Sequence, residues 1–215
     1  MTALVRRSQA SSCIEIIGSG SITFHEFALR MIVARDRCTA TGLRAGERVG
    51  FLSSCSVELY AFVFGVMALG AAATMLRHAA PVEVLVKSCL DAEVSLLATS
   101  PECLDVAALL LDSLRTRSQS FVRGGVHILC DGSHSSSLAR GFQPYPVLSC
   151  EIPHSTQPLP TGGISFQGAQ SSSACLIMFT TGSTGSSKAV PLTHEGLVWL
   201  MKAKHQAEGF GDDLL

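Results

Sequence analysis

Short runs of consecutive apolar residues alternate with stretches of helical periodicity between residues 48 and 132. An uninterrupted apolar run is typical of a strand buried on both faces, and apolar positions every three or four residues are typical of a helix with one apolar face. Their alternation predicts an α/β fold, in which helices flank a parallel sheet. The predicted elements are strand 48–54, helix 56–69, strand 71–76, helix 81–92, strand 94–100, helix 101–117 and strand 126–132.

The chain before residue 48 carries clear local signals. Residues 13–24 read as two short strands around a Gly-Ser turn. Thr23 and Glu26 have the spacing of a capping box, which predicts a helix start. The apolar face of that helix would comprise Phe24, Phe27, Ala28, Met31 and Ile32. Ser56 is the expected cap of a later helix, with Glu58 in its first turn.

Residues 59–76 contain no charged side chain over eighteen positions. Their length is marginal for a membrane span. A buried helix followed by a buried strand explains the segment equally well, and Gly65, Gly70 and the small residues 71–73 favour a break. We therefore expect no stable membrane span.

The composition divides the chain into three parts. Residues 1–132 form the layered α/β part, and residues 133–173 are a connection rich in serine, proline and glycine that includes the serine run 171–173. Residues 174–215 contain an apolar strand pattern, a glycine-rich loop and the start of a helix from about Thr193.

Charge and cysteine content narrow the class of protein. The formal net charge is −1, so nucleic acid is not an expected partner. Apolar residues make up 47% of the chain and charged residues 15%, which suggests a surface that another structure covers. The eight scattered cysteines form no C-x-x-C pair and read as reduced, mostly buried thiols, which predicts a cytoplasmic location.

The segment 179–194, FTTGSTGSSKAVPLTH, follows the apolar run 174–178. A glycine-rich loop after a buried strand can present backbone N–H groups to an anion, and hydroxyls and a lysine add further donors. The lysine does not follow a glycine, so the pattern differs from the P-loop of nucleoside triphosphatases. Two interpretations follow from the chemistry alone, a phosphate-binding loop or a plain Ser/Gly hairpin turn.

The same segment resembles the signature loop of the adenylate-forming, AMP-binding superfamily, which includes acyl-CoA synthetases and peptide-synthetase adenylation domains. That signature reads [YF]-T-[ST]-G-[ST]-T-G-x-P-K-G-[VA]. The resemblance extends upstream to about Ser21, through segments similar to the family's G-D-R-V strand, S-x-E helix and A-G-A strand. It implies that the chain is the N-terminal part of the family's large domain.

The resemblance also implies a reaction, in which ATP activates a carboxylate to an acyl-adenylate that then passes to a thiol of coenzyme A or of a pantetheine carrier. The loop would close over the β- and γ-phosphates of ATP and stabilise the leaving pyrophosphate. Mg²⁺ is expected only in a complete enzyme. The residues that would bind the phosphates are Thr180, Thr181, Gly182, Ser183, Thr184, Gly185 and Lys188.

Two positions depart from the signature, and a third extends it. Ser187 replaces the usual proline, which predicts a less rigid loop. Ala189 replaces the usual glycine and would be strained if its φ were positive. His194 matches a histidine often found after the loop, either as a substrate contact or as a residue that positions a helix.

The family's later motifs are not among these 215 residues. They are a Y-G-x-T-E segment with the Mg²⁺-binding glutamate, a T-G-D segment with the ribose-binding aspartate, and a segment with the catalytic lysine. We therefore expect a truncated, catalytically incomplete ligase-like protein. The alternative is a non-catalytic module that binds a nucleotide or pairs with a complementing chain or carrier domain.

Overall fold

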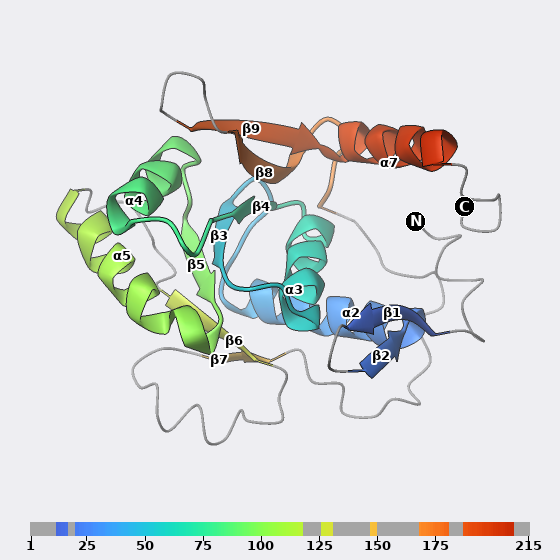
Figure 1. Cartoon of the computed structure of the whole chain (residues 1–215), viewed down its shortest axis with the longest axis horizontal. Coiled ribbons are helices and arrows are strands. Elements are labelled where there is room, and N and C mark those ends of the chain that lie inside the picture. Colours follow the sequence, from blue (N-terminus) through green and yellow to red (C-terminus); the bar gives the residue numbers. More distant parts are fainter. Residues whose placement is uncertain are drawn as a thin grey trace.

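The computed structural model describes residues 12–16, 20–117, 126–130, 147–149, 168–180 and 187–208. Two layers of helices enclose a twisted sheet (Figure 1). In chain order, the strands are β1 (Ser12–Ile16), β2 (Gly20–Thr23), β3 (Arg48–Leu52), β4 (Ala72–Met75), β5 (Leu96–Thr99), β6 (Val126–Cys130), β7 (Val147–Ser149), β8 (Ala174–Thr180) and β9 (Lys188–Thr193). The helices are α2 (Phe24–Ala40), α3 (Val57–Ala68), α4 (Val82–Asp91), the 3₁₀ helix η1 (Pro101–Cys103), α5 (Leu104–Arg117) and α7 (His194–Glu208).

The main sheet has the strand order β7-β6-β5-β3-β4-β8-β9 in the described residues. Every neighbouring pair is parallel except β8 and β9, which are antiparallel. Strands β1 and β2 form a separate antiparallel pair, as predicted. The α/β fold with a helix-flanked parallel sheet is therefore confirmed.

The sheet separates two hydrophobic cores. On one face, α2 and α3 pack against Val49 and Phe51 of β3, and Phe62 of α3 is fully buried there. On the other face, α4 and α5 pack against Leu52 and Leu97. Each large apolar side chain that is fully buried contributes roughly 1.5–3 kcal/mol to folding. Because both faces are covered, strands β3, β4 and β5 are apolar along almost their whole length, which explains the sequence pattern.

The predicted caps are formed. The Thr23 hydroxyl accepts a hydrogen bond from the Glu26 backbone N–H at 3.1 Å, and Glu26 Oε2 accepts one from the Thr23 backbone N–H at 2.9 Å. These bonds, led by the one from the Thr23 backbone, hold the pKa of Glu26 below its ordinary value, although burial opposes them. The Ser56 hydroxyl accepts from the Leu59 N–H at 3.1 Å and caps α3.

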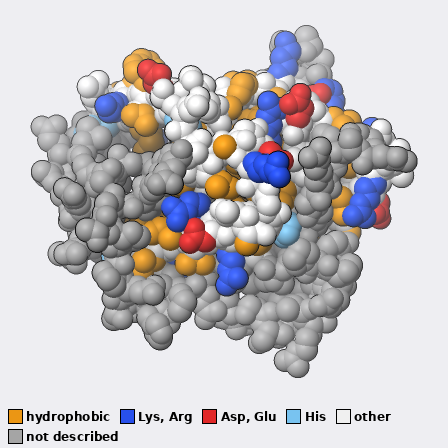
Figure 2. All heavy atoms as spheres, turned by 180° about the vertical axis from the view of Figure 1, so that it is seen from behind, with side chains coloured by type: hydrophobic (Ala, Val, Ile, Leu, Met, Phe, Trp, Pro, Cys, Tyr) orange, Lys and Arg blue, Asp and Glu red, His pale blue; other side chains and the backbone are white. Residues whose placement is uncertain are grey.

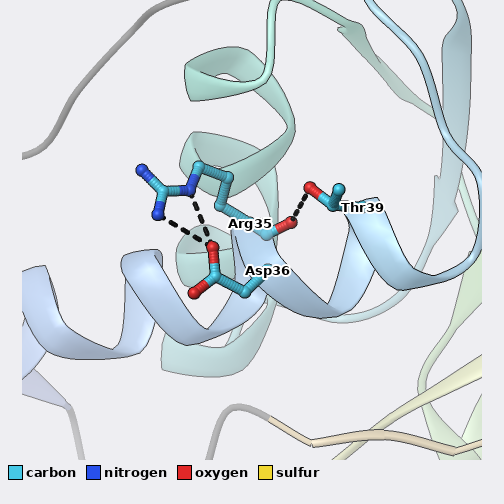
Figure 3. A network of polar contacts seen from close by, with 3 residues as sticks. All are labelled: Arg35, Asp36 and Thr39. Atoms are coloured by element: carbon cyan, nitrogen blue, oxygen red, sulfur yellow. Dashed lines mark hydrogen bonds and ion pairs between the residues drawn. The ribbon is translucent and has the colours of Figure 1, made fainter.

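Helices α2 and α3 cross at very short range. A Cβ atom on Gly65 of α3 would lie 2.8 Å from the Arg35 backbone nitrogen of α2, so the crossing requires a glycine. Arg30 of α2 also forms an ion pair with Glu58 of α3 at 3.1 Å. At the same crossing, the Arg35 side chain donates two hydrogen bonds to Asp36, and the Thr39 hydroxyl donates one to the Arg35 carbonyl (Figure 3).

The uncharged segment 59–76 is a buried helix followed by a buried strand, α3 and then β4. The turn between them contains Gly70, whose φ is +83°. In the part of the chain that the structure describes, no helix combines the length and the apolar content that a membrane span requires.

Two details differ from the sequence prediction, the start of α4 and the strand β7. Helix α4 begins at Val82, and Pro81 lies just before it. A strand that was not predicted, β7, lies inside the expected connection 133–173 and pairs with β6. The cysteines agree with the prediction of mostly buried thiols, since Cys38, Cys89, Cys103 and Cys175 are buried and Cys55 is exposed. All five are free, and burial raises the pKa of Cys38 and of Cys89 to about 12.

Gly70 should be far more sensitive to substitution than another glycine with the same backbone conformation. A Cβ atom on Gly70 would lie 2.1 Å from the Gly168 carbonyl oxygen, whereas one on Gly42, with φ +84°, would meet nothing within 4 Å. Both alanine variants should lose about 1–2 kcal/mol from the left-handed conformation, and Gly70→Ala should lose more because two backbones must separate. Urea unfolding measures both losses, and equal losses would contradict the close approach.

The Glu26 carboxylate should make the stability of α2 depend on pH. The pKa of Glu26 is lower in the folded chain than in the unfolded chain, so the ionised carboxylate stabilises the fold above the unfolded pKa of about 4.3. This stabilisation is lost as the pH falls through the folded pKa. Glu26→Gln should therefore be less stable than the wild type at pH ~7, and the difference should shrink near pH ~3. Ser56→Ala is the control, since its loss of about 1 kcal/mol involves no carboxylate and should be the same at both pH values.

Candidate phosphate-binding loop

The glycine-rich segment connects two strands of the main sheet. Strand β8 runs parallel to β4, with Ala73 opposite Leu176 and Thr74 opposite Ile177. The segment therefore leaves β8 at the edge where the parallel strands β3, β4 and β5 also have their carboxyl ends. Ligands of open α/β sheets bind at this edge.

Thr180 and Lys188 form the base of the loop. They are the last cross-strand partners of the β8–β9 ladder, so their side chains lie on the same face of the ribbon, and both are exposed. The structure thus brings two of the seven predicted residues together. The other five lie outside the described residues: Thr181, Gly182, Ser183, Thr184 and Gly185.

Lys188 is available to an anion. Among the described residues, the ion pairs are Arg30–Glu58, Arg35–Asp36, Arg48–Glu93 and Lys87–Asp91, and Lys188 belongs to none of them. An exposed ammonium group next to a threonine hydroxyl offers both charge and hydrogen-bond donors to a phosphate.

The two departures from the signature lie beside this base. Ala189 is part of β9, opposite Phe179, and the only non-glycine residue with positive φ in the described part of the chain is Glu93. The φ of Ala189 is therefore not positive, so alanine is not strained at this position. Ser187 is half-buried and directly precedes β9. Pro191 within β9 removes one backbone donor, which an edge strand tolerates.

A turn at residues 168–173 holds the start of α7. The Ser173 carbonyl accepts a hydrogen bond from the His194 N–H at 3.2 Å, and the Ser171 carbonyl accepts one from the Glu195 N–H at 3.0 Å. The Thr193 hydroxyl accepts from the Gly196 N–H at 3.0 Å and so acts as a cap. The serine run 171–173 therefore anchors a helix and is more than a linker. Burial lowers the pKa of His194, the first residue of α7.

A second polar cluster lies at the same sheet edge, between β3 and β5. The Ser54 hydroxyl donates a hydrogen bond to the Glu102 carboxylate. Burial opposes ionisation of Glu102, but hydrogen bonds led by the one from Ser54 lower its pKa. A negative charge at Glu102 disfavours the binding of a phosphate between β3 and β5.

No metal centre is evident from the described side chains. Within those residues, no group of three or more His, Cys, Asp or Glu side chains could hold a metal ion. Charges of both signs also intermix on the face seen from behind (Figure 2).

A model of the AMP-binding enzyme family matches residues 4–215 of the sequence, which is nearly the whole chain. The chain belongs to the AMP-binding enzyme family. This assignment agrees with the resemblance carried by the signature loop. A comparison with curated proteins gave no match.

Solved structures with the same fold include adenylate-forming enzymes of several kinds. A protein described as a long-chain-fatty-acid CoA ligase from Rhodopseudomonas palustris has a TM-score of 0.70 and 15% identity to this AMP-binding chain, over 96% of the chain and 45% of its own length. Amide bond synthetase McbA from Marinactinospora thermotolerans has a TM-score of 0.68 and 19% identity, over 95% and 36%. ATP-bound MatB from Rhodopseudomonas palustris has a TM-score of 0.66 and 19% identity, over 95% and 36%.

The chain thus spans less than half the length of these structural relatives. At 15–19% sequence identity, the structural similarity establishes the fold alone. This fold is the N-terminal part of the adenylate-forming fold. The antiparallel β8–β9 pairing confirms that the glycine-rich segment connects the two strands of a hairpin, one of the two interpretations that the sequence chemistry allowed.

Proposed function

We propose that the chain carries the phosphate-binding part of an adenylate-forming ligase of the acid–thiol type. In this proposal the β8–β9 loop holds the β- and γ-phosphates of ATP through Thr180, Lys188 and the intervening residues 181–185. The observation that carries the proposal is the position of Thr180 opposite Lys188 at the carboxyl edge of the sheet, on a segment that matches the family's signature.

The charge distribution at this edge supports the proposal. Helices α3, α4 and α5 each follow a parallel strand, so their N-termini lie at the same edge as the loop. Helix N-termini carry partial positive charge, and α4, which follows the strand next to β8, begins without a side-chain cap. Lys188 adds a full positive charge with no carboxylate partner among the described residues.

The role of the loop follows from the chemistry of adenylation. The carboxylate oxygen of the substrate bonds to the α-phosphorus of ATP, and the bond between that phosphorus and the bridging oxygen breaks. Negative charge then accumulates on the leaving pyrophosphate. Hydrogen-bond donors and an ammonium group fixed around that charge lower the barrier.

We further propose that residues 1–215 by themselves do not complete this reaction. They lack the Y-G-x-T-E and T-G-D motifs, and the part of the structure that is described offers no cluster of metal ligands. The buried free thiols fit a reducing compartment, which supports a cytoplasmic location.

The alternative function is a non-catalytic module that binds nucleotide or a partner polypeptide. One observation favours it, the exposure of Val198, Trp199, Leu200 and Met201 on α7. Both proposed functions use the β8–β9 loop. In the first, an assembly that contains the chain catalyses adenylation, whereas in the second no adenylation occurs.

Substitution of Lys188 should weaken polyphosphate binding. A hydrogen bond to a charged group contributes about 1.5–3 kcal/mol, so Lys188→Ala should raise the dissociation constant for inorganic tripolyphosphate about tenfold or more. Isothermal titration calorimetry measures this constant. Lys202→Ala is the matched control, because it removes an exposed lysine from α7, away from the loop, and should change the constant by less than about twofold. Equal effects of both substitutions would show that the binding is non-specific.

The 215-residue chain should not exchange pyrophosphate into ATP in the presence of carboxylic acids and Mg²⁺. Its rate should equal that of the Lys188→Ala variant, because stabilisation of the leaving group alone does not position the carboxylate and the α-phosphate. Radiolabelled pyrophosphate exchange is the measurement. A rate that exceeds background and falls in Lys188→Ala would show that these residues form a complete catalyst.

A further inference from the structure

A cavity lies at the amino edge of the main sheet, opposite the edge that carries the β8–β9 loop. It is formed by the end of α2, the turn that follows it and the start of β5, which runs parallel to β3. Its volume is about 160 Å³, close to the roughly 150 Å³ of a cavity that holds benzene. The cavity therefore has room for a small molecule, and none of its residues belongs to the candidate phosphate site.

Part of the cavity wall is apolar. Leu43 of the turn and Leu96 of β5 line it, and both are buried. Gly42 also lines it, and its φ of +84° disfavours any side chain that could fill the space. An apolar group that enters the cavity is removed from water, which favours binding.

A cationic side chain lies at the same cavity. Arg44 is exposed and belongs to none of the ion pairs found among the described residues. Its guanidinium group is therefore available to a ligand. A carboxylate is the best partner, because it can accept two parallel hydrogen bonds from a guanidinium group.

Negative charge lines the cavity as well. Glu47 is half-buried, and its Oε2 accepts a hydrogen bond from the Arg44 backbone N–H at 2.7 Å, which holds the carboxylate in place. The C-terminus of α2, where the helix dipole is negative, lies beside it. The nearby charge of Arg48 is compensated by an ion pair with Glu93 at 2.7 Å. A protonated amine is therefore favoured next to Glu47.

Two hydroxyl groups on the walls also favour a hydrogen-bond donor. The Thr41 hydroxyl donates to the Cys38 carbonyl at 2.7 Å, and the Ser95 hydroxyl donates to the Arg48 carbonyl at 3.1 Å. Each hydroxyl oxygen therefore offers only its lone pairs to a ligand. An ammonium group, which has three N–H donors, suits such acceptors.

The two charges decide between classes of ligand. A simple anion would be repelled by Glu47 and by the end of α2, and a simple cation would be repelled by Arg44. The side chains of Arg44 and Glu47 form no ion pair with each other, so both remain open to a ligand. A zwitterion with an apolar body matches the charges and the apolar wall together.

We propose that this cavity binds an α-amino acid with a small aliphatic side chain, of the size of valine or leucine. Arg44 binds the carboxylate, Glu47 binds the ammonium group, and Leu43 and Leu96 contact the side chain. The proposal concerns the amino edge of the sheet, so it goes beyond the proposed function and does not depend on phosphate binding by the β8–β9 loop.

Isothermal titration calorimetry of the 215-residue chain with L-leucine tests the proposal. The expected dissociation constant is about 1 mM or lower, as is usual for a ligand of this size. Isocaproate lacks the ammonium group of leucine, and isoamylamine lacks the carboxylate. Each should bind at least about fivefold more weakly than L-leucine, because each loses one set of charge-assisted hydrogen bonds.

Substitutions and methyl NMR spectra locate the site. Arg44→Ala should weaken L-leucine binding about fivefold or more, and Arg44→Lys, which keeps the charge but not the paired donors, should weaken it less. Arg77→Ala is the matched control, because Arg77 is also exposed but follows β4 at the opposite edge of the sheet, and it should change the constant by less than about twofold. The methyl signals of Leu96 should shift on titration, whereas those of Leu109 on α5 should not.

Three results would each overturn the proposal. The first is the absence of binding at about ten times the expected dissociation constant. The second is binding of isocaproate or isoamylamine as tight as that of L-leucine, which would show that only one charge is recognised. The third is equal affinity of the wild type and a folded Arg44→Ala variant, with circular dichroism as the check on folding.

Discussion

The pairing of β8 with β4 is the contact that places the candidate site. About one hundred residues separate Ala73 from its partner Leu176, and this pairing attaches the hairpin with the candidate phosphate-binding loop to the parallel sheet. The approach of Gly70 to Gly168 brings the turn before β4 against the segment before β8. Because β8 pairs with β4 in parallel, Thr180 and Lys188 lie at the edge of the sheet where the N-termini of the flanking helices also lie.

Local signals in the sequence predicted most elements of the layered part. The Thr23–Glu26 capping box and the Ser56 cap depend on residues three positions apart, so the sequence contains all the information that they need. Strands β3, β4 and β5 are buried on both faces and therefore appear as continuous apolar runs. The family resemblance favours a phosphate-binding role for the loop, whereas chemistry alone left the choice open between a phosphate site and a hairpin turn.

Long-range contacts explain what the sequence could not predict. The place of β5 beside β3, the addition of β7 and the pairing of β8 with β4 involve residues far apart in the chain. The conformation of Ala189 depends on its partner Phe179 in β8, and the exposure of Cys55 depends on where the β3–α3 loop lies. Helical periodicity likewise does not reveal that Val198, Trp199, Leu200 and Met201 of α7 are exposed.

The order of strands in the sheet has a consequence for synthesis of the protein on the ribosome. Strands β3 to β6 lie within residues 48–130 and can pair as the chain emerges, whereas the second edge of β4 stays open until β8 is made about one hundred residues later. During that interval the open edge of β4 is a template for wrong pairing between nascent chains. At ~5–20 residues per second the interval lasts roughly 5–20 s, long enough for chaperones to determine the yield of folded protein.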